Sequence, residues 1–395
     1  MDVALIIERF ESWRGGAETS TLQFANHLAH LGCRVTVLTT SQMPSTPELT
    51  VVPLPASRAF RSARTARFSR RAAEYVQSHR FDVVHCITPC LAADVYQPRG
   101  GTIPETLERN AAIRTSPTRR RLKQLGQQLN LKNRMLARLE SQLLARKPAP
   151  WVVAISDYVR DQLERHYHFD PARIVKVFNG VDPDESDEAQ RLADRTQIRR
   201  HYGIAYDELV VLCVAHNFKL KGVNKLIEAL ARPGGQAYRA VIVGRDNPAP
   251  YAQLAEQLGV QHRIIFTGPT QRTAAFFHAA DVLAHPTYYD PCSRVVLEAM
   301  AAGLPAITTR FNGAAERITD GLNGYVIDSP EQVDQLADRL GRLADPDHRL
   351  NCGQEAPLAV SDCSMEDHAR RVMGLYEQIV ADRGERRALE SPLRG

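Results

Sequence analysis

The feature that most constrains the fold is a series of short segments that are apolar along their whole length and alternate with helical patterns. Such segments are typical of parallel strands, which are buried on both faces of their sheet by the connecting helices. The helical patterns include Glu18–Leu31 and Thr273–Ala280. The strand candidates are residues 2–8, 34–40, 81–87, 150–156, 173–178, 209–215, 239–244, 263–268, 281–286 and 304–309. We therefore predict an α/β protein in which a Rossmann-like, doubly wound parallel sheet occurs twice.

A chain of 395 residues is too long for one ordinary hydrophobic core, so two domains are expected. The acidic, turn-rich stretch 179–190, NGVDPDESDEAQ, is the best boundary between them. We predict a first domain over residues 1–182 and a second over residues 183–365. Residues 366–395 are predicted to form a closing helix over 366–382, which packs back on the first domain, and a frayed tail.

Composition narrows the class of protein further. The chain is 44% hydrophobic and 24% charged, and its seven cysteines contain no C-x-x-C pair, which indicates a reducing compartment and no zinc-site spacing. The N-terminus MDVALIIERF is expected to be a strand rather than a signal peptide, and no apolar run approaches the ~20 residues of a membrane span. We predict a cytoplasmic protein.

Positive charge is concentrated in two segments of the first half. Residues 58–80 hold seven arginines and one acid, and residues 109–147 hold eleven Lys/Arg and one acid. These segments are either solvated helix faces or a surface that binds the anionic inner face of the cytoplasmic membrane. Nucleic acid is disfavoured because no aromatic residues lie between the arginines.

Two stretches that follow predicted strands are candidates for binding a phosphate. RGGAE, which ends at Glu18, places the paired glycines Gly15 and Gly16 at the start of a helix, where the backbone can approach an anion. A plain tight turn explains these glycines equally well, and the dinucleotide-binding G-x-G-x-x-G is absent. After the first strand of the second half, Lys219 and Lys221 lie where a helix begins, as ordinary surface lysines also do.

A third stretch, YYDPCSRVVLEAM, separates Asp290 from Glu298 by eight positions. One interpretation is that Asp290 caps a helix and Pro291 opens its first turn. The other is a site in which both carboxylates and the amides of the first turn bind a ligand. Two further short motifs follow this stretch in the sequence, Gly303–Pro305 and then Gly313–Glu316.

With these residues the chain resembles the retaining glycosyltransferases of family 4, whose signature is an acid, seven residues, Glu-Ala, G-x-P and G-x-x-E. The resemblance covers nearly the whole chain, because the paired glycines, FNGVD at 178–182 and the Lys-Gly at 221–222 also match. It implies the GT-B fold, with an acceptor-binding first domain, a nucleotide-sugar-binding second domain and a cleft between them. Within the family, VGRDNP, LAEQLGV and AADVLAHPTYYD are similar to enzymes that add glucose to the heptose of the lipopolysaccharide core.

The resemblance also implies roles for individual residues. Glu298 would hold the ribose hydroxyls of a nucleotide diphosphate sugar, with UDP-glucose as the expected donor. Asp290 and the backbone at Cys292 and Ser293 would face the sugar and phosphates, while Lys219 and Lys221 would stabilise the departing diphosphate. No metal or other cofactor is expected, and no dedicated nucleophile is visible. The predicted donor site is completed by Gly15, Gly16, Arg294, Val295 and Gly244.

On the acceptor side the resemblance points to Glu18 and to Asp94, which is also a candidate catalytic residue together with Asp290, Lys219 and Lys221, although Asp94 fits a helix or turn acid equally well. A glycan or glycolipid is the expected acceptor. His85 and His216 also follow strands, but a single histidine at a strand end is more often structural.

Two positions depart from the family pattern. The first acid is Asp290 where glutamate is usual, and Ala215 occupies the position of the phosphate-binding arginine, so that Lys219 would have to supply the second cation. A nucleotide-sugar epimerase on the same fold and a non-catalytic membrane-binding or partner-binding module are the alternative functions. Release of nucleoside diphosphate together with a glycoside would distinguish a transferase from both.

Overall fold

The computed structural model describes residues 1–11, 16–55, 64–114 and 116–390. The chain divides into two compact units. Unit 1 contains residues 1–111, 116–180 and the segment that begins at Met365, and unit 2 contains residues 112–115 and 181–364. The linker that carries the acid-rich stretch thus changes unit between Gly180 and Val181.

Unit 1 is built around a seven-stranded sheet in the order β3-β2-β1-β4-β5-β6-β7, in which every neighbouring pair is parallel. Its strands are β1 Asp2–Ile6, β2 Arg34–Thr39, β3 Leu49–Pro53, β4 Val83–Cys86, β5 Val95–Tyr96, β6 Trp151–Ala154 and β7 Ile174–Lys176. Its helices are α1 Gly16–His30, α2 Arg64–Ser78, α3 Ile103–Ala112, α4 Pro117–Leu129, α5 Leu131–Leu144, α6 Asp157–Tyr167, the 3₁₀ turn η2 Pro171–Arg173 and the C-terminal α14 Met365–Glu390.

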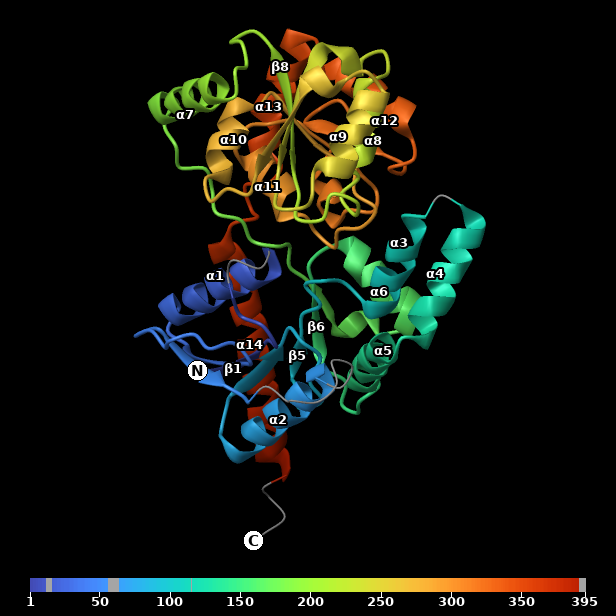
Figure 1. Ribbon diagram of the computed structural model, residues 1–395. Helices are drawn as coiled ribbons and strands as arrows, with labels where there is room; N and C mark the ends of the chain where they lie inside the picture. The colour runs from blue at the N-terminus through green and yellow to red at the C-terminus, as the bar shows by residue number, and fades with distance from the viewer. Residues whose placement is uncertain (12–15, 56–63, 115, 391–395) are drawn as a thin grey trace. The chain divides into compact units, whose positions relative to one another are not determined.

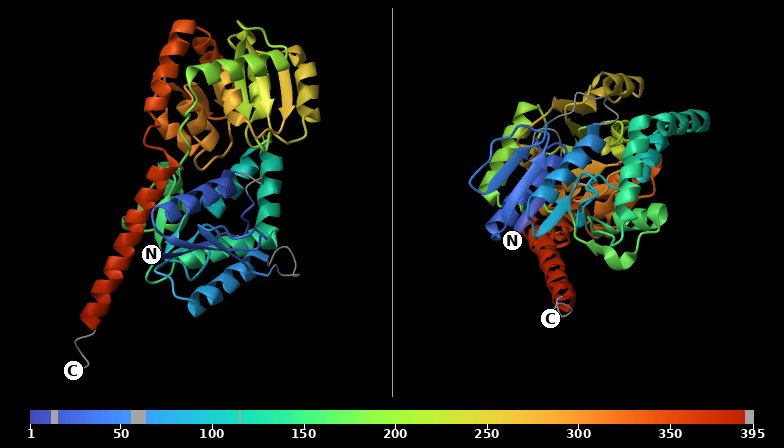
Figure 2. Two further views of the ribbon diagram at one scale, coloured as in Figure 1. Left: turned by 90° about the vertical axis from the view of Figure 1, so that its left-hand side faces the viewer. Right: turned by 90° about the horizontal axis from the view of Figure 1, so that it is seen from below.

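Helix α14 belongs to the hydrophobic core of unit 1. It packs against α1 and β4, and Figures 1 and 2 show it running alongside α1 in red. Val372 and Tyr376 are fully buried in the same cluster as Leu5 of β1 and Phe24 of α1. Burial of each such side chain contributes about 1.5–3 kcal/mol, so this core is completed by residues from the far end of the chain. The helix continues to Glu390, beyond the predicted end at residue 382, so the prediction of a frayed tail from residue 383 was wrong over this stretch.

Unit 2 contains a six-stranded parallel sheet in the order β10-β9-β8-β11-β12-β13. Its strands are β8 Leu209–Val214, β9 Tyr238–Val243, β10 Ile264–Gly268, β11 Val282–His285, β12 Ala306–Thr309 and β13 Gly324–Ile327. Its helices are α7 Glu188–His201, α8 Val223–Leu230, α9 Ala249–Gln257, α10 Thr273–Ala279, α11 Arg294–Ala301, α12 Val333–Leu343, α13 Pro346–Leu358 and the 3₁₀ turns η3 Gly235–Ala237, η4 Gln261–Arg263 and η5 Gly313–Arg317. Figure 1 shows α8, α9 and α12 gathered on one side of this sheet and α10, α11 and α13 on the other.

The prediction of two doubly wound parallel sheets is confirmed. All ten predicted strands are present, because strands such as β4, β11 and β12 are buried at every position and therefore apolar throughout. Three strands were not predicted. Two of them, β3 and β13, lie at the sheet edges, and β5 has only two residues.

Each sheet reverses its strand order once, and this reversal determines where a ligand can bind. The reversal lies between β1 and β4 in unit 1 and between β8 and β11 in unit 2. In open parallel sheets the loops that leave the carboxyl ends of such a strand pair diverge to opposite faces and leave a crevice. A ligand is therefore expected at each of the two reversals.

Candidate functional site

The crevice of unit 2 is bordered by the loops that follow β8 and β11. These loops are joined by hydrogen bonds, because the amide of Tyr288 donates to the carbonyl of Leu220 at 2.8 Å and the hydroxyl of Thr287 donates to the same carbonyl at 3.1 Å. Lys221 from one loop and Asp290 from the other are thereby brought together. The ammonium Nζ of Lys221 lies 2.5 Å from Oδ2 of Asp290. Two residues that the sequence places 69 positions apart thus form one ion pair.

Burial makes this ion pair electrostatically strong. The side chains of Lys221 and Asp290 are only 19% and 15% exposed. Burial alone would raise the pKa of Asp290, but the Lys221 cation holds that pKa well below its ordinary value. Asp290 is therefore a fixed negative charge at neutral pH.

His285, the last residue of β11, is a neighbour of Asp290 that the sequence analysis missed. Its Nε2 lies 3.5 Å from Oδ2 of Asp290, and neither ring nitrogen makes a hydrogen bond to a residue described by the structure. Burial lowers the pKa of His285, so the ring is neutral at pH 7. Its position in DVLAHP, directly after an apolar run, is the signal that could have identified it.

The start of α11 differs from the prediction. Pro291 does not open the helix, which begins at Arg294 with Ser293 as its N-cap residue. The amide of Ser293, predicted to be available to a phosphate, instead donates to Oδ1 of Asn312 at 3.0 Å. Asn312 is buried and also binds the amide of Ala314 and the hydroxyl of Thr308, so it holds the loop before the helix in place.

Helix α11 carries Glu298 on a half-buried face, one turn after Arg294. The two side chains form an ion pair with 3.2 Å between Nη2 of Arg294 and Oε1 of Glu298. Burial raises the pKa of Glu298, whereas Arg294 acts in the opposite direction. Cys292 is buried and Val295 is half-buried. The amides of the first turn have no acceptor within a helix, so the end of α11 near Asp290 is favourable for an anion.

The loop after β8 carries the remaining residues predicted for the donor site. Lys219 and His216 are exposed, whereas Ala215 is buried. The carbonyl oxygen of Ala215 lies against Gly244, at which an added Cβ would be 1.8 Å away. Gly244 is therefore required for the close approach of the loops after β8 and β9. The hydrogen bond from the amide of Phe218 to Oδ2 of Asp246, at 2.9 Å, ties these loops together.

The crevice of unit 1 opens into a cavity of about 880 Å³. It is lined by the ends of β1 and β4 and by the starts of four helices, and its wall includes Glu18 in the first turn of α1. Gly16 is the exposed first residue of that helix, whereas Gly15 lies outside the described residues. The structure thus places Glu18 at the carboxyl edge of its sheet.

Asp94 does not lie at this edge, and its predicted catalytic and acceptor-side role is corrected. It precedes β5, and its Oδ2 accepts a hydrogen bond from the amide of Val84 in β4 at 2.8 Å. Its other oxygen pairs with Arg383 of α14. Asp94 therefore lies at the amino edge of the sheet and has a structural role. His85 is likewise structural, since Nδ1 contacts the hydroxyl of Tyr376 at 2.5 Å in the core.

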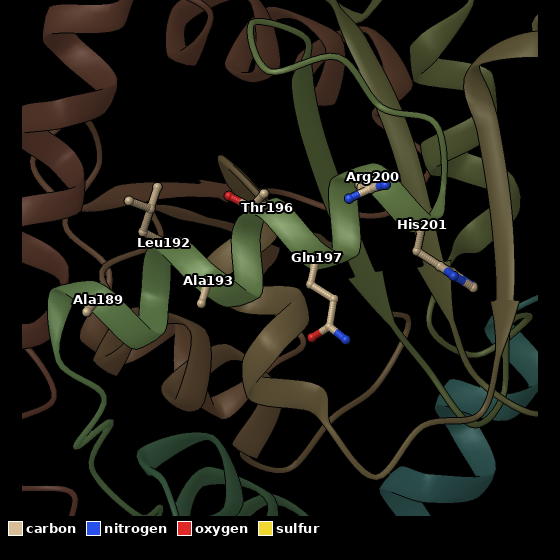
Figure 3. A pocket seen from close by; sticks show the side chains of 7 residues that line it. All are labelled: Ala189, Leu192, Ala193, Thr196, Gln197, Arg200 and His201. Carbon is tan, nitrogen blue, oxygen red and sulfur yellow. The ribbon is translucent and has the colours of Figure 1, made fainter.

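Other surface features are separate from these crevices. The hollow in Figure 3 is lined only by residues of α7, which precedes β8 in the chain. Among the described residues, one group of side chains, Glu105, Glu108 and His166, is close enough to share a metal ion. The carboxylate of Glu105 already pairs with Arg109 and Arg165, which disfavours a cation there. In the described part of the chain, no helix is long and apolar enough to cross a membrane.

Comparison with known proteins places both units in one enzyme class. The model of Glycosyltransferase Family 4 matches residues 14–185, and that of Glycosyl transferases group 1 matches residues 194–358. The chain is 27% identical to the lipopolysaccharide glucosyltransferase WaaG of Escherichia coli (strain K12), over 82% of this chain and 85% of that protein. It is 30% identical to D-inositol 3-phosphate glycosyltransferase of Mycobacterium marinum, over 61% of this chain and 53% of the relative. The alignment with this second relative thus covers about half of its length.

Solved structures agree on the fold. The crystal structure of WaaG, a glycosyltransferase involved in lipopolysaccharide biosynthesis, has a TM-score of 0.79 at 24% identity, covering 95% of this chain and 99% of that one. The sucrose-phosphate synthase of Thermosynechococcus elongatus has a TM-score of 0.76 at 19% identity, covering 96% and 99%. Anabaena Alr3699/HepE in complex with UDP-glucose has a TM-score of 0.72 at 18% identity, covering 96% and 100%. The chain is therefore a glycosyltransferase of the GT-B fold, with a Family 4 unit followed by a group 1 unit.

Proposed function

We propose that the protein transfers glucose from UDP-glucose to a glycan or glycolipid acceptor, with retention of anomeric configuration and without a metal. The observation that carries this proposal is the Lys221–Asp290 ion pair beside the start of α11, at the strand reversal of unit 2. A diphosphate bound there would meet a buried cation and the positive end of a helix. UDP-glucose is chosen because a similar fold is described with that ligand and a relative is named a glucosyltransferase.

In the proposed reaction, the bond between the anomeric carbon and the diphosphate oxygen breaks and its electron pair remains on the diphosphate. Lys221 stabilises the charge that develops there, while Asp290 keeps the ammonium in position through one carboxylate oxygen. The acceptor hydroxyl attacks the anomeric carbon on the same face, and its proton passes to the departing phosphate. This sequence retains configuration and needs neither a protein nucleophile nor a metal. Lys219, at the exposed end of the same loop, is the candidate for a second cation in place of the missing arginine.

Glu298 is proposed to accept hydrogen bonds from the two ribose hydroxyls. Its pairing with Arg294 leaves it half-buried and keeps it on the same helix as the proposed phosphate site. Because each ribose hydroxyl can donate one hydrogen bond, an ionised carboxylate is a suitable acceptor. Gly244, Cys292, Ser293 and Val295 are proposed to shape this donor site through their backbone.

Thermal unfolding with UDP-, GDP- and ADP-sugars tests the donor. A ligand at 100 times its Kd stabilises the folded state by about 2.7 kcal/mol, which shifts the midpoint measurably. UDP-glucose is expected to produce this shift in the wild type and not in Glu298→Ala. An equal shift in Glu298→Ala would contradict the assignment of Glu298, and proton NMR of the product reports whether configuration is retained.

We further propose that α4 docks the enzyme on an anionic membrane. No residue of α4 is buried, and Leu122, Leu125 and Leu129 are 64%, 56% and 76% exposed at a spacing that places them on one helix face. Arg119, Arg120, Arg121 and Lys123 accompany them, and each cation near anionic lipid contributes about 1 kcal/mol. Figure 1 shows α4 at the outer side of unit 1, beside α3.

Vesicle sedimentation tests this docking surface. Phosphatidylglycerol vesicles at low salt are expected to retain the wild type and to release the variant Leu122→Ser/Leu125→Ser/Leu129→Ser. The matched control is Leu192→Ser, because Leu192 on α7 is also exposed, at 54%. Equal retention of both variants would contradict the role of α4. A lipopolysaccharide core heptose is one candidate acceptor at such a surface, since a relative is named a lipopolysaccharide glucosyltransferase.

A further inference from the structure

The cavity of unit 1 has an electrostatic character that a neutral sugar does not require. The amino ends of four helices line it, through Ala17 and Glu18 of α1, Arg64 and Thr65 of α2, Ile103 of α3, and Leu131 and Lys132 of α5. Each of these helices has at least eight residues, and each amino end carries a partial positive charge. Four such ends around one cavity favour an anion.

Three cationic side chains line the same cavity, namely Arg9, Arg64 and Lys132. Among the residues that the structure describes, none of the three side chains has an ion pair or a hydrogen bond, and Nε of Arg64 is buried without a partner. Two carboxylates, Glu8 and Glu18, line the cavity as well. The hydroxyl of Thr65 donates to Oε2 of Glu8 at 2.6 Å, so one of these acids already has a partner within the wall.

Contacts within the wall join the segments that carry these cations. The Thr65–Glu8 hydrogen bond joins the start of α2 to the end of β1, and it places the segment of Arg64 beside that of Arg9. Lys132 enters from α5, which packs against α2. Several backbone amides of the wall are already bound, because Asn130 accepts from Lys132 and Asn133 and because Glu140 accepts from Ile103. An anion would therefore be bound mainly by the side chains.

We propose that this cavity binds a phosphate group carried by the acceptor substrate, with Arg9 and Arg64 as its ligands and Lys132 as a supporting cation. A guanidinium presents paired N–H donors that match a phosphate, and an unpaired guanidinium is ready to do so without breaking an ion pair. Glu18 in the same wall is available to accept a hydrogen bond from a sugar hydroxyl. The acceptor role rests on the proposed glycosyltransferase function, whereas the anion site depends only on unit 1.

Isothermal titration with glucose 6-phosphate and with glucose tests the site. Saturating UDP is added so that the phosphate cannot occupy the donor site. The wild type is expected to bind glucose 6-phosphate at least tenfold more tightly than glucose. Arg9→Gln/Arg64→Gln is expected to lose that difference, whereas the control Arg80→Gln, a change at an exposed residue after α2, retains it. Thermal unfolding of each variant shows whether it has folded, and Arg64→Lys should recover part of the affinity.

Equal affinity of the wild type and the folded double variant for glucose 6-phosphate would overturn the proposal. If the wild type neither binds UDP-glucose nor releases UDP, the proposed glycosyltransferase function is contradicted. The titration with glucose 6-phosphate still tests the anion site, because that site depends only on unit 1. The phosphate could be carried by a free sugar phosphate or by a phosphorylated glycolipid. These two kinds of acceptor are distinguished by measuring UDP release with glucose 6-phosphate and, separately, with a phosphorylated glycolipid in micelles. Faster release with either one, dependent on Arg9 and Arg64, supports the site and identifies its source.

Discussion

The two units share one sheet topology but differ in how charge is arranged at the strand reversal. In unit 2 the reversal holds an ion pair in which Lys221 and Asp290 are already joined at 2.5 Å. In unit 1 it holds an open cavity whose cations have no partner among the described residues. A paired, buried cluster is fixed before a ligand binds, so it suits the part of a reaction that is the same in every turnover. Unpaired cations around an open cavity can bind acceptor substrates that differ from one enzyme to another.

The strongest test of this contrast is the removal of charge from the Lys221–Asp290 pair. Lys221→Met should lower kcat by about 10²–10³-fold, the usual effect of losing one group that stabilises transition-state charge. It should also destabilise the fold by about 3–5 kcal/mol, because Asp290 becomes a buried, unpaired carboxylate. Steady-state kinetics and urea unfolding measure the two effects.

The double variant Lys221→Met/Asp290→Asn separates these effects. Neutralising both partners should restore most of the stability but none of the activity. Recovery of activity in the double variant would show that the pair is structural only. Lys176→Ala is the control, because Lys176 forms an exposed ion pair with Asp157, which contributes little.

Gly244 tests whether the close approach of the loops after β8 and β9 is required in unit 2. Gly244→Ala should lower the free energy of unfolding by about 3 kcal/mol, because its Cβ would collide with the carbonyl oxygen of Ala215. Gly374→Ala should instead stabilise the protein by up to about 1 kcal/mol, since Gly374 lies in α14 with no atom within 4 Å of an added Cβ. Urea unfolding of both variants is the measurement, and equal effects would contradict the steric argument.

Glu18 and Asp94 test which edge of the unit 1 sheet binds the acceptor. Glu18→Gln should raise KM for the acceptor about tenfold and leave the unfolding midpoint unchanged. Asp94→Asn should leave KM unchanged and lower the free energy of unfolding by about 1–2 kcal/mol. The reason is that the Asp94 carboxylate accepts a hydrogen bond from the amide of Val84 and pairs with Arg383. If Asp94→Asn altered KM in a protein of wild-type stability, the assignment of the amino edge as structural would be wrong.

The two acids of the donor site should respond to pH in opposite ways. The pKa of Asp290 is lower in the folded state, so its stabilising effect is present above the ordinary pKa of about 3.9 and is lost progressively as the pH falls from there toward the lowered pKa. The pKa of Glu298 is raised, so the cost of ionising it in the folded state grows as the pH rises above the ordinary pKa and is complete above the raised pKa, and Glu298→Gln should stabilise the free enzyme at pH 7.

Donor binding provides the second readout for Glu298. Affinity for UDP-glucose should fall as the pH drops through the raised pKa, because the protonated acid loses an acceptor. Calorimetry between pH 4 and pH 7 measures this, with Glu256→Gln as an exposed control on α9. A flat pH profile would indicate that the ribose is bound elsewhere.

Much of this architecture was predictable because the central strands are apolar on both sides. The edge strands β3 and β13 and the two-residue β5 were missed, since a partly covered or very short strand leaves no continuous apolar run. The motif spacing identified Asp290 and Lys221, but it could not show that they pair with each other. That pairing depends on which strands are neighbours, and β8 and β11 are far apart in sequence.

The errors have physical causes as well. Asp94 received an acceptor-side role from the family resemblance, and because the two-residue β5 could not be recognised, nothing in the sequence showed that Asp94 precedes a strand. The amide of Ser293 was predicted to be available because its partner, Asn312, lies 19 residues later. The cations of the unit 1 cavity come from three separate segments, and no local pattern connects them.

The position of α14 has a consequence for how the protein is made. Unit 2 is formed almost entirely by one continuous stretch, whereas the core of unit 1 requires Val372 and Tyr376 from the end of the chain. On the ribosome, most of unit 1 is synthesised first but keeps an uncovered apolar surface until Val372 and Tyr376 have emerged after unit 2. Unit 2 can complete its core earlier, so the order of folding is expected to be the reverse of the order of synthesis. The early half of the nascent chain is therefore the part that most needs protection by chaperones.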